Sequence, residues 1–106
     1  MKLELESGDV YDDVTEADIV EAIKGDGFAI LGDDPMTYIQ CAPQPDAPAE
    51  YVLEYQDGSE KRHFHAIDTP VTVDRVVAAF VKYARKDASW KRDFKWEKDE
   101  PIESFD

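Results

Sequence analysis

The alternation of apolar and polar positions predicts a chain rich in short strands. A period of two places successive side chains on opposite faces of a strand. Segments with this period, together with one short apolar run bounded by turn residues, predict strands at residues 2–6, 28–31, 36–41, 50–56 and 62–67. In the strand at 50–56, Tyr51, Leu53 and Tyr55 share one face, which we expect to lie against helices or to line a groove. Asp57-Gly58-Ser59 then indicates a hairpin turn.

Apolar residues at three- and four-residue steps predict two helices. The clearer helix follows Thr72, and its apolar stripe consists of Val73, Val76, Val77, Phe80 and Ala84. The shorter helix, at about residues 16–24, follows Thr15, and Asp18 is placed to complete a capping box. Gly25 and Gly27 favour its termination, because glycine readily adopts the left-handed conformation of a helix end.

The order of these elements predicts an α+β fold. One strand, one helix, a series of strands and a second helix are followed by an aromatic segment, and short connections favour antiparallel pairing. We therefore expect an antiparallel meander sheet of about 4–5 strands with both helices packed on one face. Residues 1–97 are expected to form this single α+β domain, and residues 98–106 an acidic, flexible C-terminal tail.

Charge is unevenly distributed along the 106 residues, whose formal net charge is −13. Residues 1–60 carry a net charge of −14, residues 61–98 carry +5, and residues 99–106 carry −4. A chain this acidic repels phosphates, which disfavours nucleic acids and anionic membranes as partners. Charge asymmetry favours an oppositely charged protein or self-association, so a monomer and a homodimer both stay open.

The N-terminus and the single cysteine indicate a reducing compartment. The N-terminal residues lack the apolar core of a signal peptide, and no apolar run approaches the ~20 residues of a membrane span, so we expect a cytoplasmic protein. Cys41 cannot form an internal disulfide, and in its acidic surroundings it is expected to be a buried apolar residue rather than a nucleophile. No cofactor motif and no catalytic set is present, so we predict neither a cofactor nor catalytic residues.

Two histidines supply the strongest candidate for a metal site. His63 and His65 lie on the same side of the predicted strand, with Cα atoms roughly 6.5 to 7 Å apart. Glu54 on the preceding strand could supply a third ligand to zinc or another transition metal. The alternative interpretation is a half-exposed histidine pair without a metal.

The segment Trp90 to Glu97 combines Trp90, Phe94 and Trp96 with three cations. Such residues either close the core or stack against a partner. The acid pairs in the chain are more typical of turns and solvated surface than of a calcium loop, because the spacing of such a loop is missing.

The sequence also resembles a family. The resemblance rests on the motifs YVLEY, QDGS and HFHA, the helix ending in FVKYARKD, Trp90, and the Phe94-Lys95-Trp96 tripeptide. These are similar to motifs of small uncharacterised bacterial proteins that resemble the immunity proteins of polymorphic toxin systems. The resemblance covers about residues 51–97. It implies a stoichiometric binding protein that covers a basic toxin surface with acidic residues, and the candidates are Asp12, Asp13, Asp33, Asp34 and Glu54.

These observations predict a non-enzymatic protein-binding domain, of the immunity type by resemblance. Aromatic side chains on an exposed sheet face would add to its partner-binding surface, and the candidates are Tyr51, Tyr55, Trp90 and Trp96. The alternatives are a protein that binds a metal or small ligand through His63 and His65, and an acidic mimic of nucleic acid.

Overall fold

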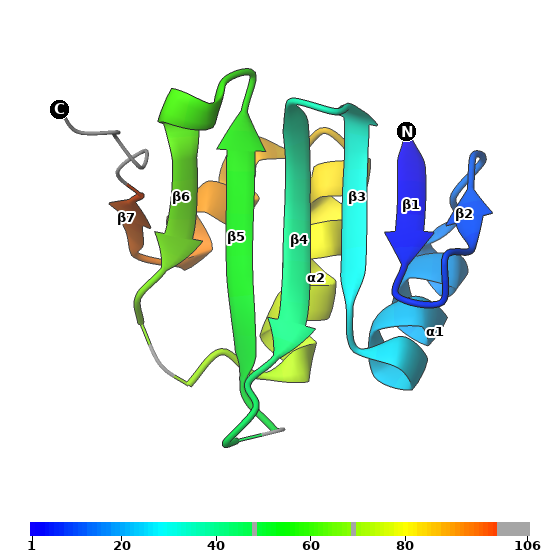
Figure 1. The fold of residues 1–106 in the computed structure, drawn as a ribbon, viewed down its shortest axis with the longest axis horizontal. Helices are drawn as coiled ribbons and strands as arrows, with labels where there is room; N and C mark the ends of the chain where they lie inside the picture. Colours follow the sequence, from blue (N-terminus) through cyan, green and yellow to red (C-terminus); the bar gives the residue numbers. More distant parts are fainter. Residues whose placement is uncertain (48, 69, 100–106) are drawn as a thin grey trace, which may run out of the picture.

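An antiparallel sheet of seven strands carries two α-helices on one face, as the computed structural model shows for residues 1–47, 49–68 and 70–99 (Figure 1). The strands lie in the order β2-β1-β3-β4-β5-β6-β7, and every neighbouring pair is antiparallel. Their bounds are β1 Lys2–Leu5, β2 Val10–Tyr11, β3 Ala29–Asp34, β4 Thr37–Pro43, β5 Tyr51–Asp57, β6 His63–Ala66 and β7 Trp96–Lys98.

The α+β class and the antiparallel sheet are confirmed, but the predicted number of strands is wrong. The two additional strands, β2 and β7, stand at opposite edges of the sheet and are only 2 and 3 residues long. Segments this short do not show a periodic pattern, so alternation alone cannot reveal them. Strand β2 pairs with β1, and β7 pairs with β6, two strands whose alternation is clear in the sequence. The short segments are therefore strands because they pair with these neighbours, not because of a pattern of their own.

The two helices begin where the sequence predicts. Helix α1 (Glu16–Asp26) has the capping box of Thr15 and Asp18, and it ends at Gly27, which has a positive φ of 84°. Helix α2 (Val73–Ala84) is capped by Thr72, whose hydroxyl accepts a hydrogen bond from the Arg75 amide. Short 3-10 helices at η1 (Glu60–Arg62) and η2 (Ala88–Asp93) complete the helical segments. Within residues 1–47, 49–68 and 70–99, no helix has the length and apolar character that crossing a membrane requires.

The core lies between the helices and the sheet. Val76 and Phe80 of α2 are fully buried, as the predicted apolar stripe requires, and Val77 packs at its margin. Their partners are alternate residues of the strands and one face of α1, the largest being Leu3, Ile19, Ile23, Leu31, Ile39 and Leu53. Burial of these side chains is the main stabilising contribution to the fold.

Ion pairs join the basic C-terminal half to the acidic N-terminal half. Arg85, at the end of α2, donates two hydrogen bonds to Glu16 at the start of α1. Lys86 pairs with Asp33 of β3 at 2.9 Å. The basic elements therefore lie partly across the acidic ones, which reduces the charge separation that the sequence suggests.

The segment after α2 returns to the sheet and extends the domain beyond the predicted boundary at residue 97. The last turn of η2 leads into β7, which pairs with β6, and the Asp99 amide donates to the His63 carbonyl at 2.8 Å. Lys98, assigned to the tail by the sequence, therefore belongs to β7, and Asp99 directly after it is hydrogen-bonded to β6. The rest of the predicted flexible tail, residues 100–106, lies outside the residues that the structure describes.

Candidate functional site

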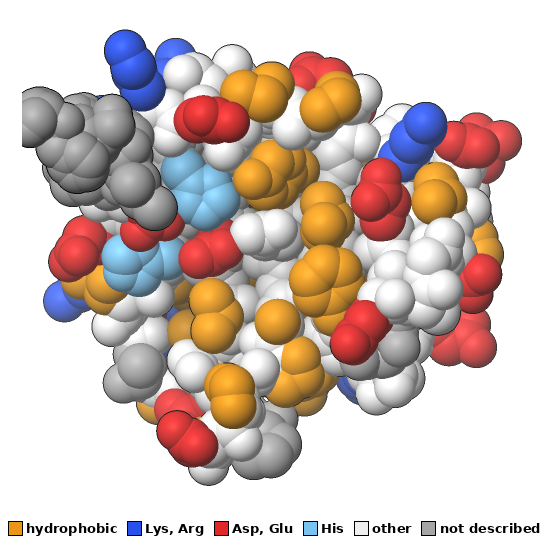
Figure 2. Space-filling model, in the orientation of Figure 1, with side chains coloured by type: hydrophobic (Ala, Val, Ile, Leu, Met, Phe, Trp, Pro, Cys, Tyr) orange, Lys and Arg blue, Asp and Glu red, His pale blue; other side chains and the backbone are white. Residues whose placement is uncertain are grey.

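The sheet has one face turned away from both helices, and we call it the uncovered face (Figures 1 and 2). Strand register arranges its side chains in two rows that cross the sheet. The first row consists of Glu4, Ile30, Gln40, Glu54, His65 and Glu97. The second row consists of Lys2, Gly32, Tyr38, Gln56 and His63.

Apolar side chains occupy the middle of the uncovered face. Four half-buried residues form what we call the apolar strip: Ile30, Tyr38, Ala42 and Val52. Figure 2 shows apolar side chains over the central strands, with carboxylates around them. Beside the strip lies a shallow hollow of about 440 Å³. It lies over Gly32, which has no side chain to fill it. A Cβ atom at this position would lie 2.8 Å from Cβ of Tyr38, so the hollow depends on glycine.

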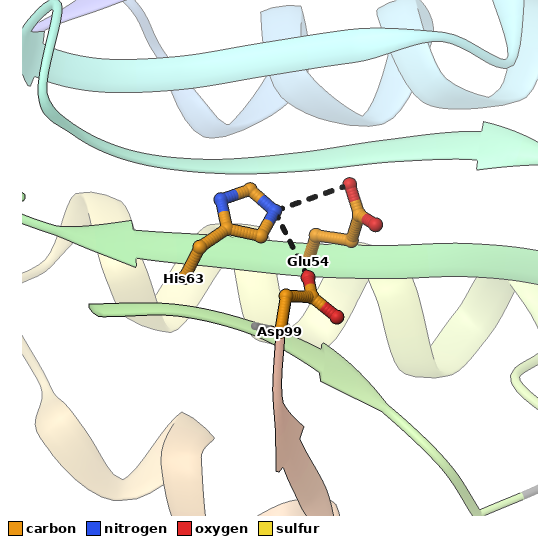
Figure 3. Close-up of side chains that lie close together, drawn as sticks. All are labelled: Glu54, His63 and Asp99. Carbon is orange, nitrogen blue, oxygen red and sulfur yellow. Dashed lines mark ion pairs between the residues drawn. The ribbon is translucent and has the colours of Figure 1, made fainter. Parts of the chain in front are cut away.

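A cluster of one imidazole and two carboxylates lies over β5 and β6 on the same face, close to the β7 edge. Its members are Glu54 of β5, His63 of β6 and Asp99, the residue that follows β7 (Figure 3). His63 Nε2 lies 3.5 Å from Glu54 Oε1 and 3.5 Å from Asp99 Oδ2. The side chains are 17%, 28% and 34% exposed for His63, Glu54 and Asp99 respectively, so the cluster is sheltered but open to solvent. We call it the carboxylate–imidazole cluster.

Neighbouring side chains orient two members of this cluster. The Gln56 side-chain amide donates from Nε2 to the Met36 carbonyl at 3.2 Å, which directs its Oε1 toward His63. Because this oxygen can only accept, the His63 Nδ1 atom, 3.1 Å away, carries the hydrogen. In the neutral ring Nε2 therefore has the free lone pair, and it points at two carboxylate oxygens. Gln40 donates to Glu54 Oε1 at 2.6 Å and holds that carboxylate in place.

His65 lies beside the cluster rather than in it. Its Nδ1 atom hydrogen-bonds Asp99 Oδ1, and its Nε2 atom lies 4.0 Å from Glu97. His63 and His65 thus share the face that their spacing predicts, and Glu54 lies next to His63. Asp99 is not among the residues that the sequence predicts for this site, and no local pattern marks it, because its position depends on the pairing of β7 with β6.

Contacts at the other end of β7 hold Asp99 in position. Asp68 accepts one hydrogen bond from the Lys95 amide at 3.0 Å and another from Arg75 Nη2 at 2.7 Å. The same guanidinium donates to the carbonyl oxygens of Asp93 and Pro70, and it stacks 4.5 Å from the centre of the Phe94 ring. Helix α2 thereby anchors the segment that ends at Asp99.

The acidic partner-binding candidates are spread over the surface. Asp12 and Asp13 are exposed in the loop before α1 and line a hollow with Ala84 of α2, away from the uncovered face. Asp33 pairs with Lys86 on the helix side. Asp34 accepts a hydrogen bond from the Met36 amide and lines the hollow beside Gly32. Glu54 lies on the uncovered face itself.

The aromatic candidates lie on the helix side of the sheet. Tyr55 and Trp90 are buried in the core with their rings 4.9 Å apart, so a partner cannot reach them. Trp96 is half-buried against Tyr55, and its indole Nε1 donates to the Lys91 carbonyl. Tyr51 also packs against the core from a half-buried position. These residues support the interpretation that the aromatic segment closes the core.

The other chemically reactive side chain is enclosed. Cys41 is buried and its Sγ donates to the Gly27 carbonyl at 3.4 Å. Burial raises the pKa of the Cys41 thiol to about 12, with a smaller opposing effect from a backbone hydrogen bond. A neutral, buried thiol is a poor nucleophile, in agreement with the sequence expectation.

Comparison of the chain with protein-family models, with curated proteins and with solved structures gave no match. The functional argument therefore starts from the uncovered face and its side chains.

Proposed function

We propose that this chain is a non-enzymatic protein-binding domain of the immunity type, whose uncovered face binds a basic surface on a bacterial toxin domain. The observation that carries the proposal is a sheet face that no helix of the described residues covers, on which the apolar strip is surrounded by carboxylates. A stable interface commonly combines an apolar centre with a polar rim. The proposal assigns no catalytic role to any residue.

The charge of the uncovered face supports a basic partner. Lys2 is the only lysine or arginine in the two side-chain rows, which also contain Glu4, Glu54 and Glu97. Four cations of the helix side, Arg75, Lys82, Arg85 and Lys86, are already engaged in ion pairs within the chain. The negative charge of the face therefore stays available to steer a positively charged protein toward it.

The rigidity of the surface supports the same proposal. Side chains of the two rows are held by cross-strand hydrogen bonds, such as Gln40 to Glu54 and Tyr38 to Gln56. A surface that is ordered before binding loses less conformational entropy when a partner docks.

The test uses the product of the gene directly upstream, if that product contains a toxin-like domain. The two proteins are co-expressed and purified, and their Kd is measured at low and high salt. We expect a one-to-one complex that weakens as salt rises, because carboxylates supply part of the attraction.

Two matched variants locate the interface. Val52→Lys adds one positive charge to the apolar strip, and Ala88→Lys adds one to the exposed start of η2. Val52→Lys should weaken binding at least tenfold, and Ala88→Lys should leave the Kd nearly unchanged. Equal effects of the two substitutions, or an upstream toxin-like protein that forms no complex, would contradict the proposal.

A further inference from the structure

We propose that Glu54, His63 and Asp99 form a binding site for one divalent transition-metal ion, with zinc as the representative member of the class. The proposal is independent of the protein-binding function, since it rests on the geometry of the carboxylate–imidazole cluster alone.

The spacing of the ligand atoms fits a tetrahedral ion. Zinc binds imidazole nitrogen and carboxylate oxygen at about 2.1 Å, so two ligand atoms of a tetrahedron lie about 3.4 Å apart. His63 Nε2 lies 3.5 Å from a carboxylate oxygen of Glu54 and 3.5 Å from one of Asp99. All three ligand atoms lie within 4.8 Å of one another, so a central ion needs only small side-chain rotations.

The orientation of the His63 ring suits a metal ligand. Its Nδ1 atom lies 3.1 Å from Gln56 Oε1, and its Nε2 atom lies 3.5 Å from a carboxylate oxygen of Glu54 and 3.5 Å from one of Asp99. Two carboxylates that converge on one ring nitrogen make a negatively charged site, which attracts a cation.

The groups around the cluster favour the metal ion. Metal-binding histidines usually donate their other ring hydrogen to an oxygen that fixes their orientation, and metal-binding carboxylates usually accept further hydrogen bonds. Gln56 has the first role for His63. Gln40 donates a hydrogen bond to the Glu54 carboxylate, and His65 hydrogen-bonds the Asp99 carboxylate. Every ligand therefore has a supporting partner, which a chance grouping of exposed acids would not provide.

The donor set selects the class of ion. One imidazole and two carboxylates suit zinc and its first-row neighbours, whereas magnesium and calcium prefer sites made of oxygen alone. Three protein ligands would leave a fourth position that water can fill.

The test is calorimetric titration of the EDTA-treated, dialysed protein with zinc chloride. We expect one site per chain, and a melting temperature about 10 °C higher when free zinc is about one hundred times the Kd. Cobalt should bind at the same site with the visible absorption of tetrahedral coordination. Magnesium chloride should produce neither binding heat nor a melting shift.

Matched variants identify the ligands. Glu54→Gln should weaken zinc binding at least tenfold, while Glu4→Gln, in the same row of the uncovered face but outside the cluster, should leave it unchanged. His63→Gln should abolish binding, and His65→Gln should weaken it only about 10- to 100-fold, as expected for a supporting residue. Asp99→Asn provides a further ligand variant. Melting of each variant in EDTA verifies that it folds.

Three results would overturn the site. Absence of zinc binding to the wild type would mean that the three side chains contact one another without a metal ion. Equal binding of zinc and magnesium, unaffected by His63→Gln, would mean unspecific attraction to an acidic surface. Loss of binding in His65→Gln but not in His63→Gln would mean that the ligand set is wrong. None of these results bears on the Kd for a protein partner, so the two proposals fail separately.

Discussion

Replacement of Asp68 should loosen the C-terminal segment of the domain. In Asp68→Ala, the Lys95 amide and the Arg75 guanidinium each lose a hydrogen-bond acceptor, at 3.0 and 2.7 Å. Asp68→Asn retains an acceptor for the amide but removes the charge that pairs with Arg75. Comparison of the two variants therefore separates the neutral hydrogen bond from the ion pair.

The magnitude follows from the burial of the pair. The side chains of Asp68 and Arg75 are 27% and 34% exposed, so solvent screens their attraction and we assign the ion pair about 1 kcal/mol. The hydrogen bond from the Lys95 amide adds about 1 kcal/mol. We expect Asp68→Ala to lower the free energy of unfolding by about 2 kcal/mol, and Asp68→Asn to lower it by about half of that. For a domain of this size, the larger loss corresponds to about 8 °C in Tm.

Urea denaturation followed by tryptophan fluorescence measures this effect. The two tryptophans of the chain, Trp90 and Trp96, lie edge-on with ring centres 5.8 Å apart in the affected segment. Their emission therefore reports its release directly, and circular dichroism at the same urea concentrations reports the whole domain. Asp46→Asn, which changes an exposed loop carboxylate, is the matched control and should alter stability by less than about 0.5 kcal/mol.

The pH dependence gives the sign of the electrostatic contribution. Burial alone would raise the pKa of Asp68, but hydrogen bonds from Arg75 and the Lys95 amide outweigh it and lower the pKa below its ordinary value of 3.8. A carboxyl whose pKa is lowered by folding stabilises the native state above the ordinary value. The advantage of the wild type over Asp68→Asn should thus be complete at neutral pH and disappear as the pH falls through the lowered pKa. A difference that stays constant down to acid pH, or an Asp68→Ala variant as stable as Asp46→Asn, would refute this reasoning.

Further predictions concern the core and the uncovered face. Phe80→Ala removes a fully buried ring and should cost about 3–5 kcal/mol in urea unfolding; a loss below about 1 kcal/mol would contradict its central position. Gly32→Ala places a Cβ atom 2.8 Å from Cβ of Tyr38, so it should lower stability by about 1–3 kcal/mol, and an unchanged Tm would show that the strands move apart freely. Cys41 should resist a thiol reagent at pH 8 in the native protein, because its thiol is buried with a pKa of about 12, and should react fully in urea. Rapid modification of the native protein would mean that the structure around Cys41 opens to solvent.

Much of the fold could be predicted from local sequence patterns. The capping box at Thr15, the stripe of α2 and the hairpin after Asp57 depend on residues close together in the chain, and the structure contains each of them. The alternation at Tyr51, Leu53 and Tyr55 correctly grouped them on one side of β5, and the structure shows that this side faces the helices rather than a groove. Local patterns suffice there because the apolar residues of each element repeat with the period of that element, and these residues are the ones buried in the core.

The edges of the sheet could not be predicted in this way. Strand β7 has 3 residues, and its place beside β6 depends on contacts that Arg75 and Asp68 make with the backbone before it. No short-range pattern encodes such a contact. For the same reason the sequence does not decide whether the aromatic segment at residues 90–97 lies in the core or on the surface. The burial of Trp90 in the structure shows that the segment closes the core.

The candidate site was predictable in part. Hairpin register brings β5 and β6 together, so Glu54 and His63 could be placed near each other from the sequence. The second carboxylate, Asp99, follows a strand that comes after an intervening helix, and its position depends on the packing of that whole segment. A cluster assembled from distant parts of a chain needs a three-dimensional structure to be found.

The late position of β7 in the chain has a consequence for synthesis. Until residues 88–99 have left the ribosome, the outer edge of β6 has no partner, and the stacked rings of Tyr55 and Phe64 lack the cover of Trp96. An unpaired strand beside exposed aromatic rings readily pairs with another molecule. A nascent chain at this stage would aggregate more readily than the finished protein, and a shortened product ending before β7 should accumulate in inclusion bodies.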